Sequence, residues 1–137
     1  MRKVLIVDDE LLARRMLKES IVWEEYGYTV CAEAGNGKEG LEKTKIFAPD
    51  LIFVDIKMPL MDGLELVKKL KEQGFSGEIV MLTCYEEFSY VREAMRYGAM
   101  DYLVKHTFEE KDLTDLLLRA EESVRWEETR LESMNLL

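Results

Sequence analysis

The chain has 137 residues, with 19 Lys and Arg against 28 Asp and Glu, so its formal net charge is −9. This length fits a single domain, and 47% hydrophobic residues with only 8 Gly and 2 Pro predict a packed core, which excludes a disordered or fibrous chain. The acidic balance excludes non-specific binding of nucleic acid by this chain alone. No apolar run approaches the roughly 18 residues of a membrane span, so we expect no membrane partner and a cytoplasmic location.

Five short apolar runs alternate along the chain with longer amphipathic stretches. The runs cover residues 4–7, 29–34, 51–54, 78–82 and 101–104. Their nearly continuous hydrophobicity is typical of parallel strands that are covered on both faces. The alternation predicts right-handed βαβ units and therefore an α/β fold with a parallel sheet.

The stretches between these runs have the spacing and punctuation of helices. Asn36-Gly37 is a helix-start signal, and Gly74 and Gly98 lie where helices are expected to end. Apolar residues mark the face that we expect the first helix to bury, namely Leu12, Met16, Leu17, Ile21 and Trp23.

Two further groups of side chains are predicted to belong to the core. Cys31 and Cys84 lie in apolar surroundings and outside any CxxC pair, so we interpret them as reduced core thiols. An aromatic stripe at helical spacing is likewise more typical of a core than of an interface. Its members are Tyr85, Phe88, Tyr90 and Tyr97.

Residues 108–137 predict one helix that is unusually long and dense in charge. The apolar pattern covers about three heptads, the lower limit for a coiled coil, and Glu127 interrupts it. Two interpretations remain open: a final packing helix with a solvated extension, or a helix that dimerises or links domains. The apolar residues of this pattern are Leu113, Leu117, Ala120, Val124, Leu131 and Met134.

Three carboxylates directly follow predicted strands. Asp8 and Asp9 come after the first strand and Asp55 after the third, so they converge at one sheet edge if these strands are neighbours. Like charges at such a distance require a cation. Oxygen ligands favour Mg²⁺, and His106, the sole histidine, cannot build a His-based zinc site.

The same edge is predicted to carry two further polar groups. Thr83 ends the fourth strand and Lys105 ends the fifth. A hydroxyl and an ammonium that face a metal can hold the oxygens of a transferring phosphoryl group, which leaves a carboxylate as the nucleophile. The residues therefore predict a phosphoryl site beside Mg²⁺.

Four segments carry a resemblance to a known family. The chain resembles the receiver domain of bacterial two-component response regulators over residues 2–122. The segments that carry the resemblance are residues 3–10, 49–63, 82–83 and 101–105. The resemblance implies a doubly wound, flavodoxin-like (βα)5 fold, a three-layer sandwich whose five parallel strands have the order 2-1-3-4-5. The resemblance further implies a phosphoacceptor signalling domain rather than an enzyme.

The resemblance also implies roles for individual residues. Asp55 accepts a phosphoryl group from a sensor histidine kinase. Asp9 binds Mg²⁺ directly, Asp8 acts mainly through water, and the Lys57 carbonyl completes the protein ligands. Thr83 and Lys105 bind the phosphoryl oxygens. Thr83 and Tyr102 match the switch pair, in which the hydroxyl moves toward the phosphate and the ring turns inward.

What the domain controls follows from the same resemblance. Residues 83–90 resemble receivers joined to an AraC-type helix-turn-helix domain, which implies control of transcription through a DNA-binding domain outside this chain. We expect residues 1–122 to form the receiver and residues 123–137 to extend the last helix as a linker toward that effector domain. We also expect a homodimer, formed through the fourth helix, fifth strand and fifth helix or through the C-terminal helix.

Two residues depart from the family pattern. His106 replaces the proline that usually follows the lysine, and a cis bond at a non-proline residue costs about 3–4 kcal/mol, so we expect a trans bond or a strained one. This places the aim of Lys105 in question. Cys84 is bulkier than the usual small residue beside Thr83. We interpret it by default as a packed thiol, and narrowed access to the phosphate is the alternative.

Three other interpretations compete with the receiver. Residues 35–40 match the GxGxxG dinucleotide pattern, but they follow the second strand and leave Asp8, Asp9, Thr83 and Lys105 unexplained. A phosphatase with an aspartyl nucleophile commonly has a second Asp where this chain has Lys57. A phosphorylation-independent protein-interaction module is the more serious alternative because of His106.

Overall fold

The computed structural model describes residues 1–135, apart from the side chains of Tyr85, Val124, Arg125, Glu127 and Asn135. Five parallel strands form one sheet in the order β2-β1-β3-β4-β5, which confirms the predicted topology. Each predicted strand is present, and its ends differ by no more than two residues from the prediction. The strands are β1 (Arg2–Val7), β2 (Tyr28–Ala34), β3 (Leu51–Asp55), β4 (Glu78–Thr83) and β5 (Asp101–Val104).

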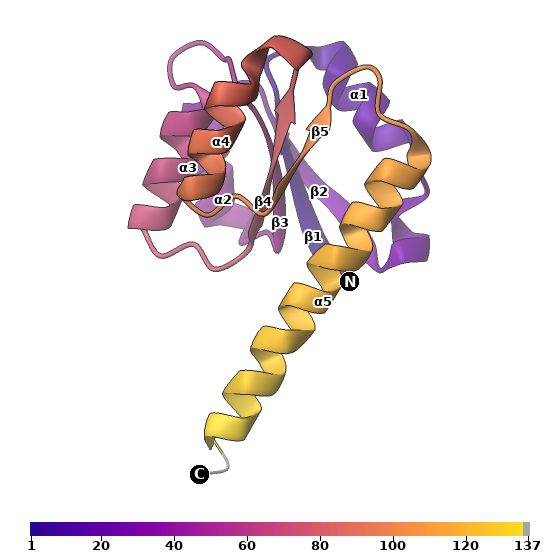
Figure 1. Ribbon diagram of the computed structural model, residues 1–137, viewed down its shortest axis with the longest axis vertical. Helices are drawn as coiled ribbons and strands as arrows, with labels where there is room; N and C mark the ends of the chain where they lie inside the picture. Colours follow the sequence, from indigo (N-terminus) through magenta and orange to yellow (C-terminus); the bar gives the residue numbers. More distant parts are fainter. Residues whose placement is uncertain (136–137) are drawn as a thin grey trace.

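Helices cover both faces of the sheet, as the doubly wound fold requires (Figure 1). Helices α1 and α5 lie on one face, and α2, α3 and α4 lie on the other. Two short 3-10 turns, η1 and η2, complete the described elements. The helical elements are α1 (Leu11–Glu19), η1 (Trp23–Tyr26), α2 (Gly37–Phe47), α3 (Gly63–Glu72), η2 (Tyr85–Glu87), α4 (Phe88–Arg96) and α5 (Glu110–Asn135).

The two-residue period of a strand divides the core into two clusters. In β1, Val4 and Ile6 face α1 and α5, whereas Leu5 and Val7 face the opposite helices. All four are fully buried, which explains why the run reads as continuously apolar. The sheet is thereby held rigidly between two apolar layers, with its carboxyl-terminal edge free to carry polar groups.

Helix starts at this edge depend on local capping and close packing. Asn36 Oδ1 accepts a hydrogen bond from the Glu39 amide at 2.8 Å, and Asp62 Oδ1 accepts one from the Glu65 amide at 2.8 Å. A Cβ on Gly63 would lie 2.0 Å from the Asp55 carbonyl oxygen, so glycine alone lets α3 begin this close to the end of β3.

The buried face predicted for the first helix is partly wrong. Leu12 and Met16 are exposed, while Leu17 and the unpredicted Ala13 are buried. Because α1 ends at Glu19, the apolar residues beyond it do not belong to its face. Trp23 lies in η1 and packs edge-to-face on Phe53 with ring centroids 5.8 Å apart. The predicted face therefore combines side chains from two successive elements into one helical pattern.

Helix α5 begins two residues later than predicted and extends well beyond the domain (Figure 1). Its first half is a packing helix, with Leu113 and Leu117 in the core cluster against the sheet and Ala120 also buried. Further along, Leu131 and Met134 are exposed, which agrees with a solvated extension. The interruption at Glu127 and the Val124 side chain lie outside the described part of the structure.

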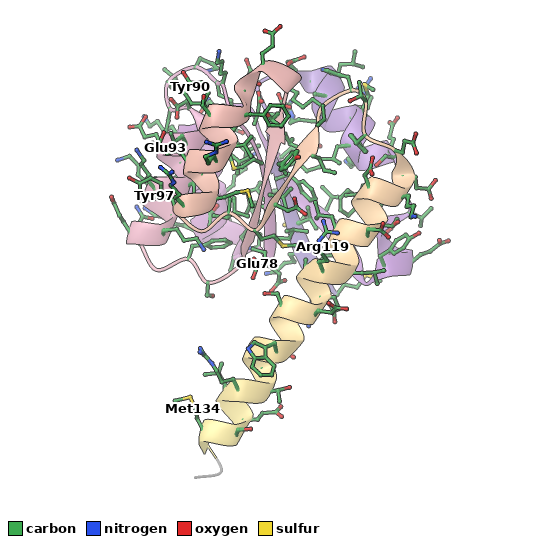
Figure 2. The ribbon with its side chains drawn as sticks, in the orientation of Figure 1. Glu78, Tyr90, Glu93, Tyr97, Arg119 and Met134 are labelled. Carbon is green, nitrogen blue, oxygen red and sulfur yellow. The ribbon has the colours of Figure 1, made fainter. Side chains whose placement is uncertain are left out.

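Two predictions of core residues are also corrected. Cys31 is half-buried but Cys84 is exposed, because it follows the last residue of β4, where the chain leaves the sheet; both are free thiols. Phe88, Tyr90 and Tyr97 are exposed rather than buried. Figure 2 shows Tyr90 and Tyr97 along the outer side of α4. Over the described residues, no helix is both long and apolar enough to cross a membrane.

Candidate functional site

Four carboxylates converge at the carboxyl-terminal edge of the sheet. One oxygen from each of Asp8, Asp9, Glu10 and Asp55 lies within 4.8 Å of the others. Asp8 and Asp9 follow β1 and Asp55 ends β3, and these strands pair directly. The predicted convergence of three aspartates is therefore confirmed. Asp8 and Asp55 are buried, whereas Asp9 and Glu10 are exposed.

Lys105 brings a positive charge into this cluster from the end of β5. Its Nζ lies 2.8 Å from Glu10 Oε1, 3.0 Å from Asp8 Oδ2 and 3.3 Å from Asp55 Oδ2. The Lys105 amide donates a 2.7 Å hydrogen bond to the Thr83 carbonyl, which fixes the strand end. The ammonium therefore reaches the aspartates even though His106 replaces the usual proline.

His106 is accommodated by an unusual backbone conformation. No cis peptide bond occurs among the described residues, so the bond before His106 is trans, one of the two predicted outcomes. Its φ of 65° lies in the left-handed region, which is uncommon for a residue with a side chain. The imidazole is partly exposed, and its Nε2 lies 3.8 Å from Glu10 Oε2.

Burial and like charge perturb the titration of the central groups. Burial, reinforced by the neighbouring Asp8 carboxylate, raises the pKa of Asp55 to about 8, although Lys105 opposes the shift. Burial disfavours the Lys105 ammonium, yet the surrounding carboxylates of Glu10, Asp8 and Asp55 raise its pKa. A hydrogen bond from Lys105 lowers the pKa of Glu10. The single ammonium of Lys105 does not neutralise the four carboxylates, so the cluster retains an excess of negative charge.

The donor set fits a hard divalent cation. Asp8 Oδ2 is buried and accepts no hydrogen bond from the described residues, although Lys105 Nζ lies nearby. The Lys105 ammonium beside this oxygen is shared with Glu10 and Asp55, so it compensates the carboxylate charge only in part. Every ligand atom that the cluster offers is a carboxylate oxygen, the type that Mg²⁺ prefers over the nitrogen and sulfur ligands typical of zinc.

The two residues of the predicted switch pair lie at different depths. Thr83 is fully buried at the end of β4, and its hydroxyl donates a 2.9 Å hydrogen bond to the Cys84 carbonyl. Tyr102 is partly exposed on β5, and its ring packs edge-to-face on Phe88 with centroids 6.2 Å apart. The threonine hydroxyl is engaged by the Cys84 backbone at the end of β4, while the tyrosine ring contacts α4.

Lys57 and Cys84 occupy the loops that follow β3 and β4. The exposed Lys57 side chain places its ammonium 5.7 Å from the centroid of the Tyr90 ring, so this loop contacts α4. The Cys84 amide donates a 2.9 Å hydrogen bond to Glu87 Oε1, and burial raises the pKa of its thiol. The metal role of the Lys57 carbonyl and the steric role of Cys84 stay predictions.

Glu10 is the residue of this site that the sequence did not reveal. It makes the shortest of the three contacts to Lys105 and belongs to the four-carboxylate cluster. The sequence feature that could have indicated its role is its position directly after Asp8 and Asp9, in the loop that follows β1.

The glycine-rich segment at residues 35–40 packs closely against neighbouring elements. The Gly37 amide donates a 3.1 Å hydrogen bond to the Met61 carbonyl, and a Cβ at Gly37 would lie 2.4 Å from that oxygen. A Cβ on Gly40 would lie 3.0 Å from the Val7 side chain. Packing at the start of α2 therefore accounts for these two glycines.

Comparison with known proteins agrees with this geometry. The family model described as "Response regulator receiver domain" matches residues 4–118. The chemotaxis protein CheY of Bacillus subtilis is 40% identical over 103 residues, which cover 75% of this chain and 84% of that protein. An uncharacterized transcriptional regulatory protein of the same organism, YesN, is 38% identical over 116 residues and 85% of this chain.

A solved structure gives the same result in three dimensions. The REC domain of AraT, a response regulator from Geobacillus stearothermophilus, matches with a TM-score of 0.85 and 38% identity, over 93% of this chain and 98% of that one. The chain spans only 32% of the length of YesN, so the likeness to YesN concerns one part of that regulator. The chain belongs to the response regulator receiver domains, the signalling domains of two-component systems.

Proposed function

We propose that Asp55 is the phosphoacceptor of this receiver and that a sensor histidine kinase is its donor. The observation that carries the proposal is the position of Asp55, a buried carboxylate 3.3 Å from Lys105 and inside the four-carboxylate cluster. An aspartate that only capped a helix or paired with lysine would not need three further carboxylates around it. Excess negative charge of this kind supports a site for a cation and a phosphoryl group.

In the transfer, a carboxylate oxygen of Asp55 attacks the phosphorus of a phosphohistidine. The P–O bond forms as the P–N bond breaks, and the imidazole leaves with the electron pair of that bond. Asp8, Asp9, Asp55 and the Lys57 carbonyl would hold Mg²⁺, which supplies positive charge to the phosphoryl oxygens. Lys105 supplies a second positive charge to the same oxygens.

The response of the domain involves Thr83 and Tyr102. The Thr83 hydroxyl exchanges its bond to the Cys84 carbonyl for one to the phosphoryl group, and the Tyr102 ring leaves Phe88 and turns inward. This changes the surface made by α4, β5 and α5, through which we propose a homodimer. The effect is a shift in the populations of two conformations.

The output of the whole protein is part of the same proposal. Residues 1–122 form the receiver, and residues 123–137 extend α5 toward an effector domain that binds DNA and controls transcription. The projecting, exposed second half of α5 supports a linker role (Figure 1). The similarity to the transcriptional regulatory protein YesN supports the same output, with an AraC-type helix-turn-helix domain as the finer proposal.

Intact-mass measurement after incubation with Mg²⁺ and acetyl phosphate tests this function. We expect a phosphoryl adduct on the wild type that is absent when Mg²⁺ is removed and absent in Asp55→Asn. A wild type without an adduct would overturn the proposal in favour of a phosphorylation-independent interaction module. Continuous turnover of phosphoester substrates would instead identify a phosphatase.

A further inference from the structure

Glu10 holds the buried ammonium of Lys105 more closely than either aspartate does. We propose that Glu10 competes with the phosphoryl group for Lys105 and thereby sets the affinity of the site for that anion. The inference rests on the proposed function of the site, because it assigns to Glu10 a positioning role toward the same phosphoryl group.

The contacts single out Glu10 as the outer partner of Lys105. The Lys105 side chain is 4% exposed, whereas the Glu10 side chain is 52% exposed. The two aspartates that share the ammonium are both buried. Glu10 therefore closes the Lys105 site on the side that faces water, which is the side from which an anion must arrive.

The position of Glu10 is defined by its neighbours. Its amide donates a 2.9 Å hydrogen bond to Asp8 Oδ1, so the backbone is anchored to the buried aspartate. One carboxylate oxygen lies 2.8 Å from Lys105 Nζ, and the other lies 3.8 Å from His106 Nε2. The carboxylate is thus placed between the ammonium and the residue that replaces the usual proline.

Competition follows from charge and from the difference in burial. A phosphoryl group on Asp55 adds negative charge and three acceptor oxygens within reach of Lys105. The Glu10 carboxylate repels the phosphoryl group. It also occupies the Lys105 ammonium, the donor that the phosphoryl oxygens require. Of the three carboxylates around Lys105, only that of Glu10 is already exposed and can rotate into solvent. Glu10 is therefore the group that releases Lys105 when the anion binds. Breaking the contact between Glu10 and Lys105 requires free energy, and this lowers the affinity of the site for the anion.

Glu10→Gln is the sharpest test, because it removes the charge and keeps the shape. Glu72→Gln, on an exposed glutamate at the far end of α3, is the matched control. Beryllofluoride serves as the phosphoryl probe, with Mg²⁺ present, and its binding is measured by ¹⁹F NMR titration. We expect Glu10→Gln to bind the probe about fivefold to tenfold more tightly than the wild type, and Glu72→Gln to bind it as the wild type does.

A titration of Mg²⁺ alone separates this role from that of a metal ligand. We expect the Mg²⁺ affinity of Glu10→Gln to stay within about tenfold of the wild type. A larger loss would assign Glu10 to the cation and overturn the inference. Equal beryllofluoride affinities would overturn the inference and leave the proposed function intact. Absence of binding by both proteins would overturn the two together.

Discussion

The ammonium of Lys105 lies 3.3 Å from a carboxylate oxygen of Asp55, at the ends of two strands that are separated by β4. The same ammonium lies 3.0 Å from the buried Asp8, so two buried carboxylates share one buried cation. Once Asp55 is ionised, above its raised pKa of about 8, these three buried groups carry an excess negative charge inside the folded domain. This imbalance costs stability, and the same imbalance makes the site suitable for Mg²⁺ and a phosphoryl group.

Asp55→Asn should stabilise the domain in the absence of Mg²⁺. Because the folded-state pKa of Asp55 is about 8, above its ordinary 3.8, the folded state binds more protons than the unfolded state between these values. The contribution of Asp55 to the stability of the wild type therefore falls as pH rises from about 4 to about 8. Asparagine cannot ionise, so the variant should exceed the wild type by at least about 2 kcal/mol at pH 8.

Urea unfolding in EDTA at several pH values between 5 and 9 measures this difference. The advantage of Asp55→Asn should grow as pH rises and level off above about pH 8. A constant difference across the range, or a variant less stable than the wild type at pH 8, would contradict the assignment of the shift to Asp55.

Addition of Mg²⁺ should reverse the wild-type destabilisation. A ligand that binds only the folded state at a hundred times its dissociation constant stabilises it by about 2.7 kcal/mol. Thermal unfolding at pH 8 with increasing Mg²⁺ should therefore show a rising Tm for the wild type. Asp9→Asn should respond much less, since we propose that Asp9 binds the cation directly. The same rise in both proteins would exclude Asp9 as a ligand.

The strand ends could be predicted from the sequence, and with them much of the candidate site. Asp8, Asp9, Asp55 and Lys105 follow apolar runs whose length and character predict buried parallel strands, and the sheet topology then brings their ends together. The contact between Glu10 and Lys105 could not be predicted, because it depends on the path of a loop and a side-chain rotamer.

Exposure of helical side chains was less predictable for a related reason. Leu12 and Leu17 both fit an apolar stripe on α1, and only the packing against the sheet decides that Leu17 is buried. The aromatic side chains of α4 and of Tyr97, which caps its end, also have helical spacing, yet Tyr90 and Tyr97 lie on the outer side of this helix (Figure 2). Spacing identifies a face, but the tertiary contacts decide which face turns inward.

Thr83→Ala should separate phosphorylation from the response. The variant loses the hydroxyl that donates to the Cys84 carbonyl and that we propose to contact the phosphoryl group, while Asp55 and the acidic cluster remain. Mass spectrometry of the intact chain should still show the adduct, but light scattering should show no increase in the molar mass of the assembly on phosphorylation. Thr83→Ser, which keeps a hydroxyl, is the control and should still dimerise on phosphorylation. Normal dimerisation of phosphorylated Thr83→Ala would refute the coupling.

Removal of residues 123–137 should leave a folded domain. This segment reaches the rest of the domain through surface interactions such as the hydrogen bond of Ser123 to Glu78 and the ion pair of Arg2 with Glu128. Exposed pairs of this kind contribute about 0–1 kcal/mol, so the decrease in stability should be of that size. Leu117→Ala, which truncates a buried side chain of α5, should cost about 2–5 kcal/mol. Urea unfolding distinguishes the two, and a truncated chain that fails to fold would place the domain boundary further along α5.

Gly63→Ala should damage both the fold and the site. The added Cβ would lie 2.0 Å from the Asp55 carbonyl oxygen, and its three nearest atoms all belong to the backbone of Asp55 and Ile56, so no flexible side chain can move aside. We expect a loss of at least about 3 kcal/mol in urea unfolding, together with slower formation of the phosphoryl adduct, because α3 must move away from the end of β3. Gly35→Ala is the matched control at the same edge of the sheet, since its Cβ would meet only side-chain atoms at 3.8 Å and 3.9 Å. The free energy of unfolding of Gly35→Ala should stay within about 1 kcal/mol of the wild-type value. Equal losses in the two variants would show that the close approach of Gly63 to Asp55 does not determine the stability of this edge.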